Sequence, residues 1–445
     1  MNPFLSVFFL AGIPILFLLQ RHKTLFVLSL ISVVSDLFRI STFGTNLYIF
    51  NYIALFYSIY FFQDVFKPPA SSGWFFLKYL FAEYFLLIIG AIVFGVLFPW
   101  EDPFSDRSWN QRISNRAAIA LVKSFSDIMV CYYFHYLFKK QLVSGPFLFN
   151  ALGIITVINI VIAISDFFTG YAIKFSLFSV EIRNEILSRF TGLEGEPRVL
   201  GRNSGLTFLM FYCFSLNKVI FSKWQNLYLI VSILGLILSI SVSAAVTTTL
   251  VFGVLLLFHW KPRHLLTVAL FTIIATVSYQ IISKNEYYQF LMELRLGRLE
   301  QGNEYDQMVG EPLIFTKFEV FDRAALNFFY NNPKHLLLGA GPNLINFPAG
   351  NYISNFELTL YAGHLDNPPF TGILFILSRS GILGLFIYGL LFLHLFQLAR
   401  LKGSRLCSDF LWLILVFCNI IFMPFYMLLA IYWGVYYYSS NQNNA

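Results

Sequence analysis

The sequence predicts an all-α polytopic membrane protein with about 12 transmembrane helices and one large external loop that contains short helices. Of its 445 residues, 58% are apolar and only 12% are charged, whereas soluble domains hold roughly 45–50% apolar and about 25% charged residues. One crossing needs about 20 apolar residues, so the chain has enough for roughly a dozen. This composition excludes a soluble enzyme, a disordered chain and a small disulfide-stapled secreted domain.

Apolar stretches bounded by charges, Pro or Gly recur along the whole chain, which we therefore take as a single transmembrane domain, 1–445. The stretches lie at 3–20, 25–41, 46–63, 75–99, 116–138, 146–168, 203–217, 225–242, 244–260, 264–283, 369–398 and 409–438. Pro424 falls inside the last stretch and could break it into two short crossings. The count of 12 or 13 spans stays open.

Basic residues mark every second junction and so orient the predicted helices. They are Arg21, Lys23, Lys67, Lys78, Lys139, Lys140, Lys218, Lys223, Lys261, Arg263, Arg400, Lys402 and Arg405. Such a bias is typical of cytoplasmic loops, so the formal net charge of +7 has a topological cause and gives no reason to expect a nucleic acid partner. The other connections are then external, and three are substantial: 100–115, 169–202 and 284–368.

The connection at 284–368 is the large external loop. From Lys284 to Asp366 it holds ten acidic and six basic residues, and loops of such length are usually functional or have structure of their own. Residues 312–331 have helical apolar spacing and predict a helix lying against the membrane, ended by Pro333 and the Gly-rich segment 339–343. A bundle with such a loop favours chemistry or recognition at the outer membrane face.

Several charges fall inside predicted spans, where ionisable groups are costly and suggest function. They are Asp36 with Arg39, Lys78 with Glu83, and Lys123 with Asp127. Spacings of three or four residues let two of these pairs neutralise each other on one helix face; a transport or substrate path is the alternative. A transporter more typically has matched halves with broken helices, and no such matching is visible in the sequence.

Arginines in the external connections are unexpected, because the topology rule disfavours them there. Arg183, Arg189, Arg198 and Arg202 lie in 169–202, and Arg323 lies in the large loop. They could extend toward lipid phosphates. Alternatively, two or three could converge on a phosphate-bearing ligand, because the planar guanidinium suits pyrophosphate.

Four segments in the second half of the chain carry recognisable motifs in a fixed order. They read RFTGLEGEPRVLGRNSG at 189–205, SISVSAAVTTTLVFGVLL at 239–256, RAALNFFYNNPKHLLLGAGPN at 323–343 and HLDNPPFTGILFILSRSGILG at 364–384. Together they resemble the O-antigen ligase and O-antigen polymerase superfamily of bacterial lipid-linked glycan transferases, over about residues 185–390.

The resemblance rests on particular positions. An Arg that opens an R-x-x-G-x-x-x-x-P-x-x-x-G segment looks like Arg189, and a second Arg, before a helix that ends in Pro and Gly-x-Gly, looks like Arg323. A loop His leads into a helix that contains Gly-Ile-Leu-Gly, here Gly381 to Gly384, and this His looks like His364. Two features depart from the pattern: Ser243-Ala244-Ala245 replaces the usual Ser-Arg-Gly, and His364 stands further from Gly381 than the family's His.

The resemblance implies transfer of a glycan from undecaprenyl diphosphate to an acceptor hydroxyl at the periplasmic face of the bacterial cytoplasmic (inner) membrane. Arg189 and Arg323 would stabilise the departing diphosphate, with no metal required, and Arg198 and Arg202 would be secondary phosphate contacts. The acceptor hydroxyl needs a base, for which we take His364 first and Asp366 second. Direct displacement would invert the anomeric centre.

The leading hypothesis is therefore an O-antigen or capsule-type polysaccharide polymerase that passes the growing glycan to the next lipid-linked repeat unit. An O-antigen ligase, which uses the lipopolysaccharide core as acceptor, is one alternative, and a lipid-linked oligosaccharide transporter is another. The expected partners are the lipid-linked oligosaccharide, membrane lipid and a candidate chain-length regulator. No cofactor is expected, since the external segments contain no Asp-x-Asp and no His/Cys/Glu cluster with metal spacing.

Overall fold

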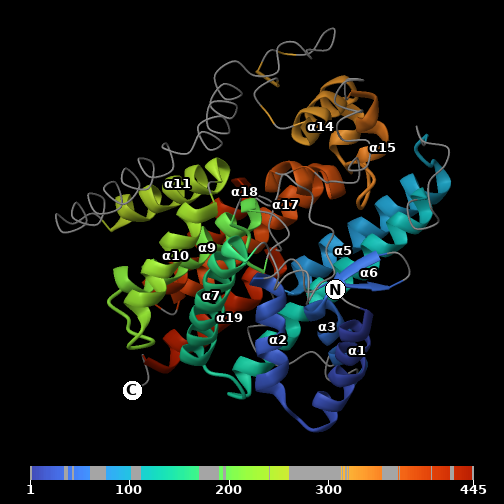
Figure 1. The fold of residues 1–445 in the computed structure, drawn as a ribbon. Helices are drawn as coiled ribbons and strands as arrows, with labels where there is room; N and C mark the ends of the chain where they lie inside the picture. The colour runs from blue at the N-terminus through green and yellow to red at the C-terminus, as the bar shows by residue number, and fades with distance from the viewer. Residues whose placement is uncertain are drawn as a thin grey trace.

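The computed structural model describes residues 3–34, 39–42, 45–60, 77–101, 112–169, 190–193, 197–239, 241–259, 312, 314–315, 318, 320–352, 369, 371–401, 403–420 and 425–442. Helices dominate these residues (Figure 1), so the predicted all-α class is confirmed at this coarse level.

The first half of the chain supplies α-helices and one small hairpin. Its elements are α1 (Pro3–Leu18), α2 (His22–Val34), β1 (Arg39–Thr42), β2 (Thr45–Tyr48), α3 (Ile49–Tyr60), α5 (Leu77–Ile92), the π-helical turn η2 (Val93–Leu97), α6 (Ile113–Lys139) and α7 (Gly145–Phe168). The start of α7 follows directly from the sequence, because the Ser144 hydroxyl accepts a hydrogen bond from the Phe147 amide and Pro146 fits the first turn of a helix.

The second half supplies more helices and a compact outer segment. Its elements are α9 (Pro197–Leu216), α10 (Gln225–Ser239), α11 (Val242–Phe258), α14 (Val320–Asn331), the 3-10 turn η6 (Pro333–Leu336), α15 (Asn346–Ala349), the 3-10 turn η7 (Gly350–Tyr352), α17 (Gly372–Leu401), α18 (Arg405–Ile420) and α19 (Phe425–Gln442). We call residues 320–352, which run from α14 to η7, the cap.

Four described helices are long and apolar enough to cross a membrane. They are Lys78–Leu97, Ile113–Lys139, Gly145–Phe168 and Gly372–Leu401. Shorter apolar helices occupy Phe8–Leu18, His22–Ser32, Ile49–Tyr60, Gln225–Ser239 and Ser243–Phe258. The predicted span at 264–283 lies outside the described residues.

One predicted span differs from the structure, and a second follows one of the two alternatives left open for it. The stretch predicted at 25–41 is helical only to Val34, and residues from Arg39 to Tyr48 form the antiparallel hairpin β1–β2 instead. Thr42 ends β1 and Thr45 begins β2, and threonine favours extended backbone because β-branched side chains lose freedom in a helix. The stretch at 409–438 is two helices, α18 and α19. Proline cannot continue a helix, and Pro424, itself outside the described residues, falls between them.

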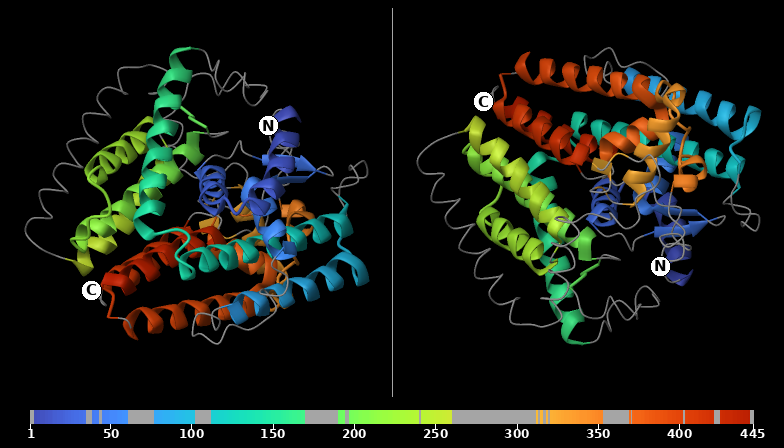
Figure 2. Two further views of the ribbon diagram at one scale, coloured as in Figure 1. Left: turned by 90° about the horizontal axis from the view of Figure 1, so that it is seen from below. Right: turned by 90° about the horizontal axis from the view of Figure 1, so that it is seen from above.

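Helix α19 is the centre of the bundle. Every residue from Tyr426 to Tyr436 except Gly434 appears among the buried apolar side chains, and Trp433 and Tyr432 are among the largest that are fully buried. A helix that is apolar on all sides is a buried helix, and α6, α7 and α18 pack around this one. Figure 2 shows another close pairing of helices, in which α5 and α17 run side by side at the edge of the bundle.

Contacts sort the helix ends into two groups. At one end the last turns of α9 and α11 meet the first turn of α18, and α7 starts against Tyr438 near the end of α19. This basic end carries Lys139, Lys218 and Arg405. At the opposite end α9, α11 and α17 begin, α10 and α18 finish, and the cap rests on the start of α17 (Figure 1). We call this second group the cap end.

Candidate functional site

The segment after Arg189 is fixed to the cap end of α7. Phe190 stacks on Phe167 with ring centroids 4.2 Å apart, and the Leu193 amide donates to the Asn159 side-chain oxygen at 2.6 Å. Gly192 has φ +58°, and a Cβ there would lie 2.3 Å from that oxygen. Only glycine accepts both conditions, so the segment has one defined path. Arg189 itself lies outside the described residues.

The start of α9 is fixed in the same way and carries Arg202. Pro197 is the first helical residue, where a missing amide proton costs nothing. Gly201 lets α9 approach the turn between α10 and α11, because a Cβ there would lie 2.3 Å from the Ser239 hydroxyl. Arg202 follows, partly buried, and interacts electrostatically with Cys418 near the end of α18. The side chain of Arg198 lies outside the described residues.

Helix α14 brings Arg323 to the same end of the bundle. Nine of its twelve residues are buried, so most of the helix faces protein rather than lying open to lipid. Arg323 is only 2% exposed. Its neighbour Asp322 accepts hydrogen bonds from Thr371, through the amide at 3.1 Å and the hydroxyl at 2.7 Å. These bonds hold α14 on the first turn of α17.

Helix α17 is broken where the Gly-rich segment of the cap meets it. Gly381 has φ 66° and ψ −162° inside the helix, and the Ala340 amide donates to the Ser378 carbonyl at 2.8 Å. Gly339 has φ +74° and Gly341 has φ +92°; at Gly341 a Cβ would lie 3.1 Å from the Gly90 carbonyl of α5. The segment 339–341 therefore lies between α5 and α17.

An aromatic cluster packs against the other side of the cap. The Trp100 indole donates to the Ala340 carbonyl at 2.9 Å and stacks on Phe94, with centroids 5.3 Å apart. His335 lies against the rings of Trp100 and Phe328, at 5.0 Å and 5.5 Å. Burial among these rings, reinforced by Lys334, lowers the pKa of His335 below its usual value of 6.5. The imidazole is therefore neutral at pH 7, which suits packing among aromatic rings.

The arginines predicted to bind diphosphate are thus brought partly together. Arg202 interacts electrostatically with Cys418 near the end of α18, and Gly372 packs so closely on the Cys418 carbonyl that no Cβ would fit. Thr371, next to Gly372, bonds Asp322 beside Arg323. One connected group of helix ends therefore carries both Arg202 and Arg323. His364 and Asp366 lie outside the described residues, as Arg189 does.

Arg379 is a charged residue that sequence reasoning missed. It lies on α17 beside the break, 8% exposed, and donates to the Ser124 hydroxyl of α6 at 2.7 Å while its guanidinium covers the Phe375 ring at 4.9 Å. The signal was present, since Arg379 is the sole Lys, Arg, Asp or Glu residue in the apolar stretch 369–398. An arginine in such a stretch is as costly as the other intramembrane charges and equally suggests function.

The intramembrane acids have partners on other helices. Asp127 of α6 accepts from the Asn51 amide of α3 at 2.7 Å, and Glu83 of α5 accepts from the Tyr426 hydroxyl of α19 at 2.8 Å. Both bonds join helices far apart in the sequence. Within the described residues no group of three or more His, Cys, Asp or Glu side chains could hold a metal ion.

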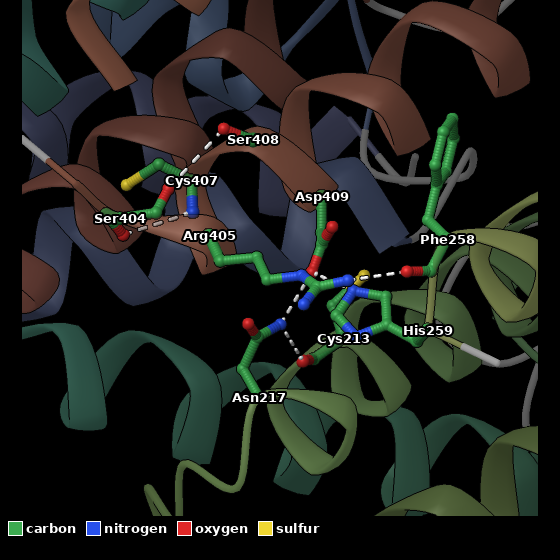
Figure 3. A network of polar contacts seen from close by, with 9 residues as sticks. All are labelled: Cys213, Asn217, Phe258, His259, Ser404, Arg405, Cys407, Ser408 and Asp409. Atoms are coloured by element: carbon green, nitrogen blue, oxygen red, sulfur yellow. Dashed lines mark hydrogen bonds and ion pairs between the residues drawn. The ribbon is translucent and has the colours of Figure 1, made fainter. Parts of the chain in front are cut away.

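The basic end has a polar network of its own. Asp409, on α18, is 4% exposed and accepts from the His259 ring at 2.7 Å and from the Asn217 amide at 2.7 Å. Figure 3 shows Asp409 between these two side chains, while Arg405 donates to the Phe258 carbonyl. The network ties the ends of α9 and α11 to the start of α18, at the end of the bundle opposite the cap.

Comparison with known proteins adds no relative, because no family model matches the chain and no curated protein matches it. The fold and the site together define a helical protein with helices able to span a membrane and buried arginine at one end.

Proposed function

We propose that this protein is a polysaccharide polymerase of the O-antigen or capsule type. It would be a membrane glycosyltransferase that moves a growing glycan from undecaprenyl diphosphate to the next lipid-linked repeat unit. The reaction would take place at the periplasmic face of the bacterial cytoplasmic membrane, with about 12 or 13 crossings and residues 284–368 as the external loop.

The observation that carries this proposal is the gathering of Arg202 and Arg323 at the cap end, opposite the basic end. Arg323 is 2% exposed, and an arginine that merely reaches for lipid phosphates would be exposed at the membrane surface. Burial also strengthens its interaction with an anion, because little water screens the charge. A buried guanidinium at the outer end of a bundle suits a lipid-linked diphosphate.

The proposed chemistry is a direct displacement. The bond between the donor's anomeric carbon and its phosphate oxygen breaks, and a bond to the acceptor hydroxyl forms. His364, or else Asp366, takes the acceptor proton. The arginines stabilise the charge that develops on the departing undecaprenyl diphosphate, so the step needs no metal ion and inverts the anomeric centre.

The test is the surface glycan of the host bacterium on a gel, after deletion of the gene and complementation with variants. A polymerase defect leaves core with a single repeat unit, and a ligase defect leaves bare core with glycan stranded on the carrier lipid. We expect the first pattern, and we expect Arg189→Ala and Arg323→Ala to reproduce it at normal protein levels. Arg112→Ala is the matched control, because Arg112 is exposed at the start of α6. Normal ladders from both site variants would refute the proposal.

A transporter of lipid-linked oligosaccharide is the second candidate, favoured by the break in α17 next to Arg379, since broken helices with nearby charge are common in transporters. Loss of a transporter strands single lipid-linked units on the inner face of the membrane. Accessibility of the lipid-linked unit to an externally added glycosidase, measured in spheroplasts of the deletion strain, separates the two: a polymerase defect leaves the unit accessible.

A further inference from the structure

The contact between Asp322 and Thr371 joins the two parts of the proposed site. Asp322 is 4% exposed, and its two carboxylate oxygens accept separately from the Thr371 amide and hydroxyl, at 3.1 Å and 2.7 Å. Thr371 directly precedes α17, so the carboxylate sits at the helix N-terminus, where negative charge is stabilised. Each carboxylate oxygen accepts from a different group of Thr371, and these two bonds together fix the orientation of the Asp322 carboxylate.

The cap has a second attachment to the same stretch of α17. The Ala340 amide donates to the Ser378 carbonyl, and seven helical residues span about 10 Å. The cap is thus held at two points along the first part of α17, ahead of the break at Gly381. Two separate attachments prevent the cap from rotating about either one, so residues next to an attachment keep a fixed place relative to α17.

We propose that Asp322 is a positioning residue for the transfer reaction, a proposal that rests on the proposed function. Arg323 follows Asp322 directly on α14, and the candidate bases Asp366 and His364 precede Thr371 by five and seven residues in the sequence. The Asp322–Thr371 pair holds the arginine that stabilises the leaving diphosphate at a fixed place relative to the point where the acceptor-side segment enters α17.

This pairing has a chemical requirement that identifies aspartate. In the observed arrangement the Thr371 amide and hydroxyl each donate to a different carboxylate oxygen of Asp322. Asparagine keeps one acceptor oxygen for the Thr371 amide, but its NH2 group would have to donate to the Thr371 hydroxyl, and both bonds would lose the strength that a charged carboxylate gives. Glutamate is one carbon longer and would displace α14. The rate of transfer depends steeply on such placement, because a shift of about 1 Å in a reacting group costs up to about 100-fold.

The experiment compares Asp322→Asn and Thr371→Val with Trp100→Phe in purified protein reconstituted in lipid. Trp100→Phe is the matched control, because it also removes one hydrogen bond that holds the cap, at Ala340, and leaves the Asp322–Thr371 bonds in place. The measurements are kcat and KM for chain extension of a lipid-linked repeat unit, the dissociation constant of a short-chain polyprenyl diphosphate, and the unfolding midpoint.

We expect Asp322→Asn to lower kcat by about 10- to 100-fold, Thr371→Val to lower it by less, and Trp100→Phe to leave kcat within about twofold of the wild type at a similar unfolding midpoint. If Asp322 acts through Arg323, adding Asp322→Asn to Arg323→Lys weakens polyprenyl diphosphate binding no further, since coupled residues are not additive.

Additive effects in that double variant would overturn the inference, as would kcat losses in both Asp322→Asn and Thr371→Val that merely match Trp100→Phe. If Asp322→Asn does not fold, Thr371→Val, which removes a single bond, decides. Failure of the proposed function looks different: the wild type neither extends chains nor binds polyprenyl diphosphate, and Arg323→Ala changes nothing.

Discussion

Replacing Gly381 with alanine should open the contact between the cap and α17. Gly381 has φ 66° and ψ −162°, a conformation that costs a residue with a Cβ roughly 1–3 kcal/mol. The new Cβ would also lie 2.2 Å from the Leu337 carbonyl oxygen and 2.6 Å from the Gly339 nitrogen. Relief of that overlap moves the Gly-rich segment and weakens the bond from Ala340 to Ser378, which contributes about 1 kcal/mol.

The expected loss in the free energy of unfolding is therefore about 2–4 kcal/mol. The assay is unfolding of the purified protein in mixed micelles with increasing SDS, followed by tryptophan fluorescence. Gly389→Ala is the control on the same helix, because a Cβ at Gly389 meets nothing within 4 Å. If Gly381→Ala and Gly389→Ala unfold at the same SDS fraction, glycine at the break in α17 does not stabilise the contact with the cap. That result would refute the reasoning.

Two further outcomes test other parts of the structure. Asp409→Ala should lower the free energy of unfolding by about 1–3 kcal/mol, because it removes the carboxylate that accepts from the buried His259 ring and from the Asn217 amide; an unfolding midpoint equal to that of Ser408→Ala would contradict this. For His335, the lowered pKa means that the unfolded chain binds the proton more readily than the folded protein. Stability should therefore fall as the pH drops below about 6.5, and His335→Phe should show a smaller loss than the wild type between about pH 7.5 and about pH 5; equal losses would exclude His335 as the cause.

Local signals in the sequence predicted most helix boundaries well. The stretch predicted at 146–168 is α7, Gly145–Phe168, because Ser144 and Pro146 provide a start signal that needs no distant contact. Pro333 and the Gly-rich segment end α14 as expected. The polar hairpin from Arg39 to Tyr48 was missed, since apolar periodicity alone does not separate a short strand from a helix end.

The break in α17 could not be predicted, because its cause is a segment about forty residues away in the sequence. A single glycine inside an apolar run is compatible with an uninterrupted helix, and the sequence does not reveal that the Leu337 carbonyl occupies the space where a Cβ of residue 381 would lie. The pairing of Asp322 with Thr371 is likewise a long-range contact. The sequence could therefore predict the arginines of the candidate site and the end of the bundle at which they lie. It could not predict the long-range contacts that hold them in place.

The motif residues that carry the resemblance fall into two groups, glycines that permit close packing and an arginine that does not serve packing. Gly192, Gly201, Gly339 and Gly341 each lie where a Cβ would meet a neighbouring element, so any bundle with these packing contacts would need glycine there, whatever its chemistry. Arg323 is different, because burying a guanidinium at 2% exposure is costly, and apolar packing does not offset that cost. The glycines therefore support only the fold, and the case for a diphosphate substrate depends on the buried arginine and on what the Arg323 variants do.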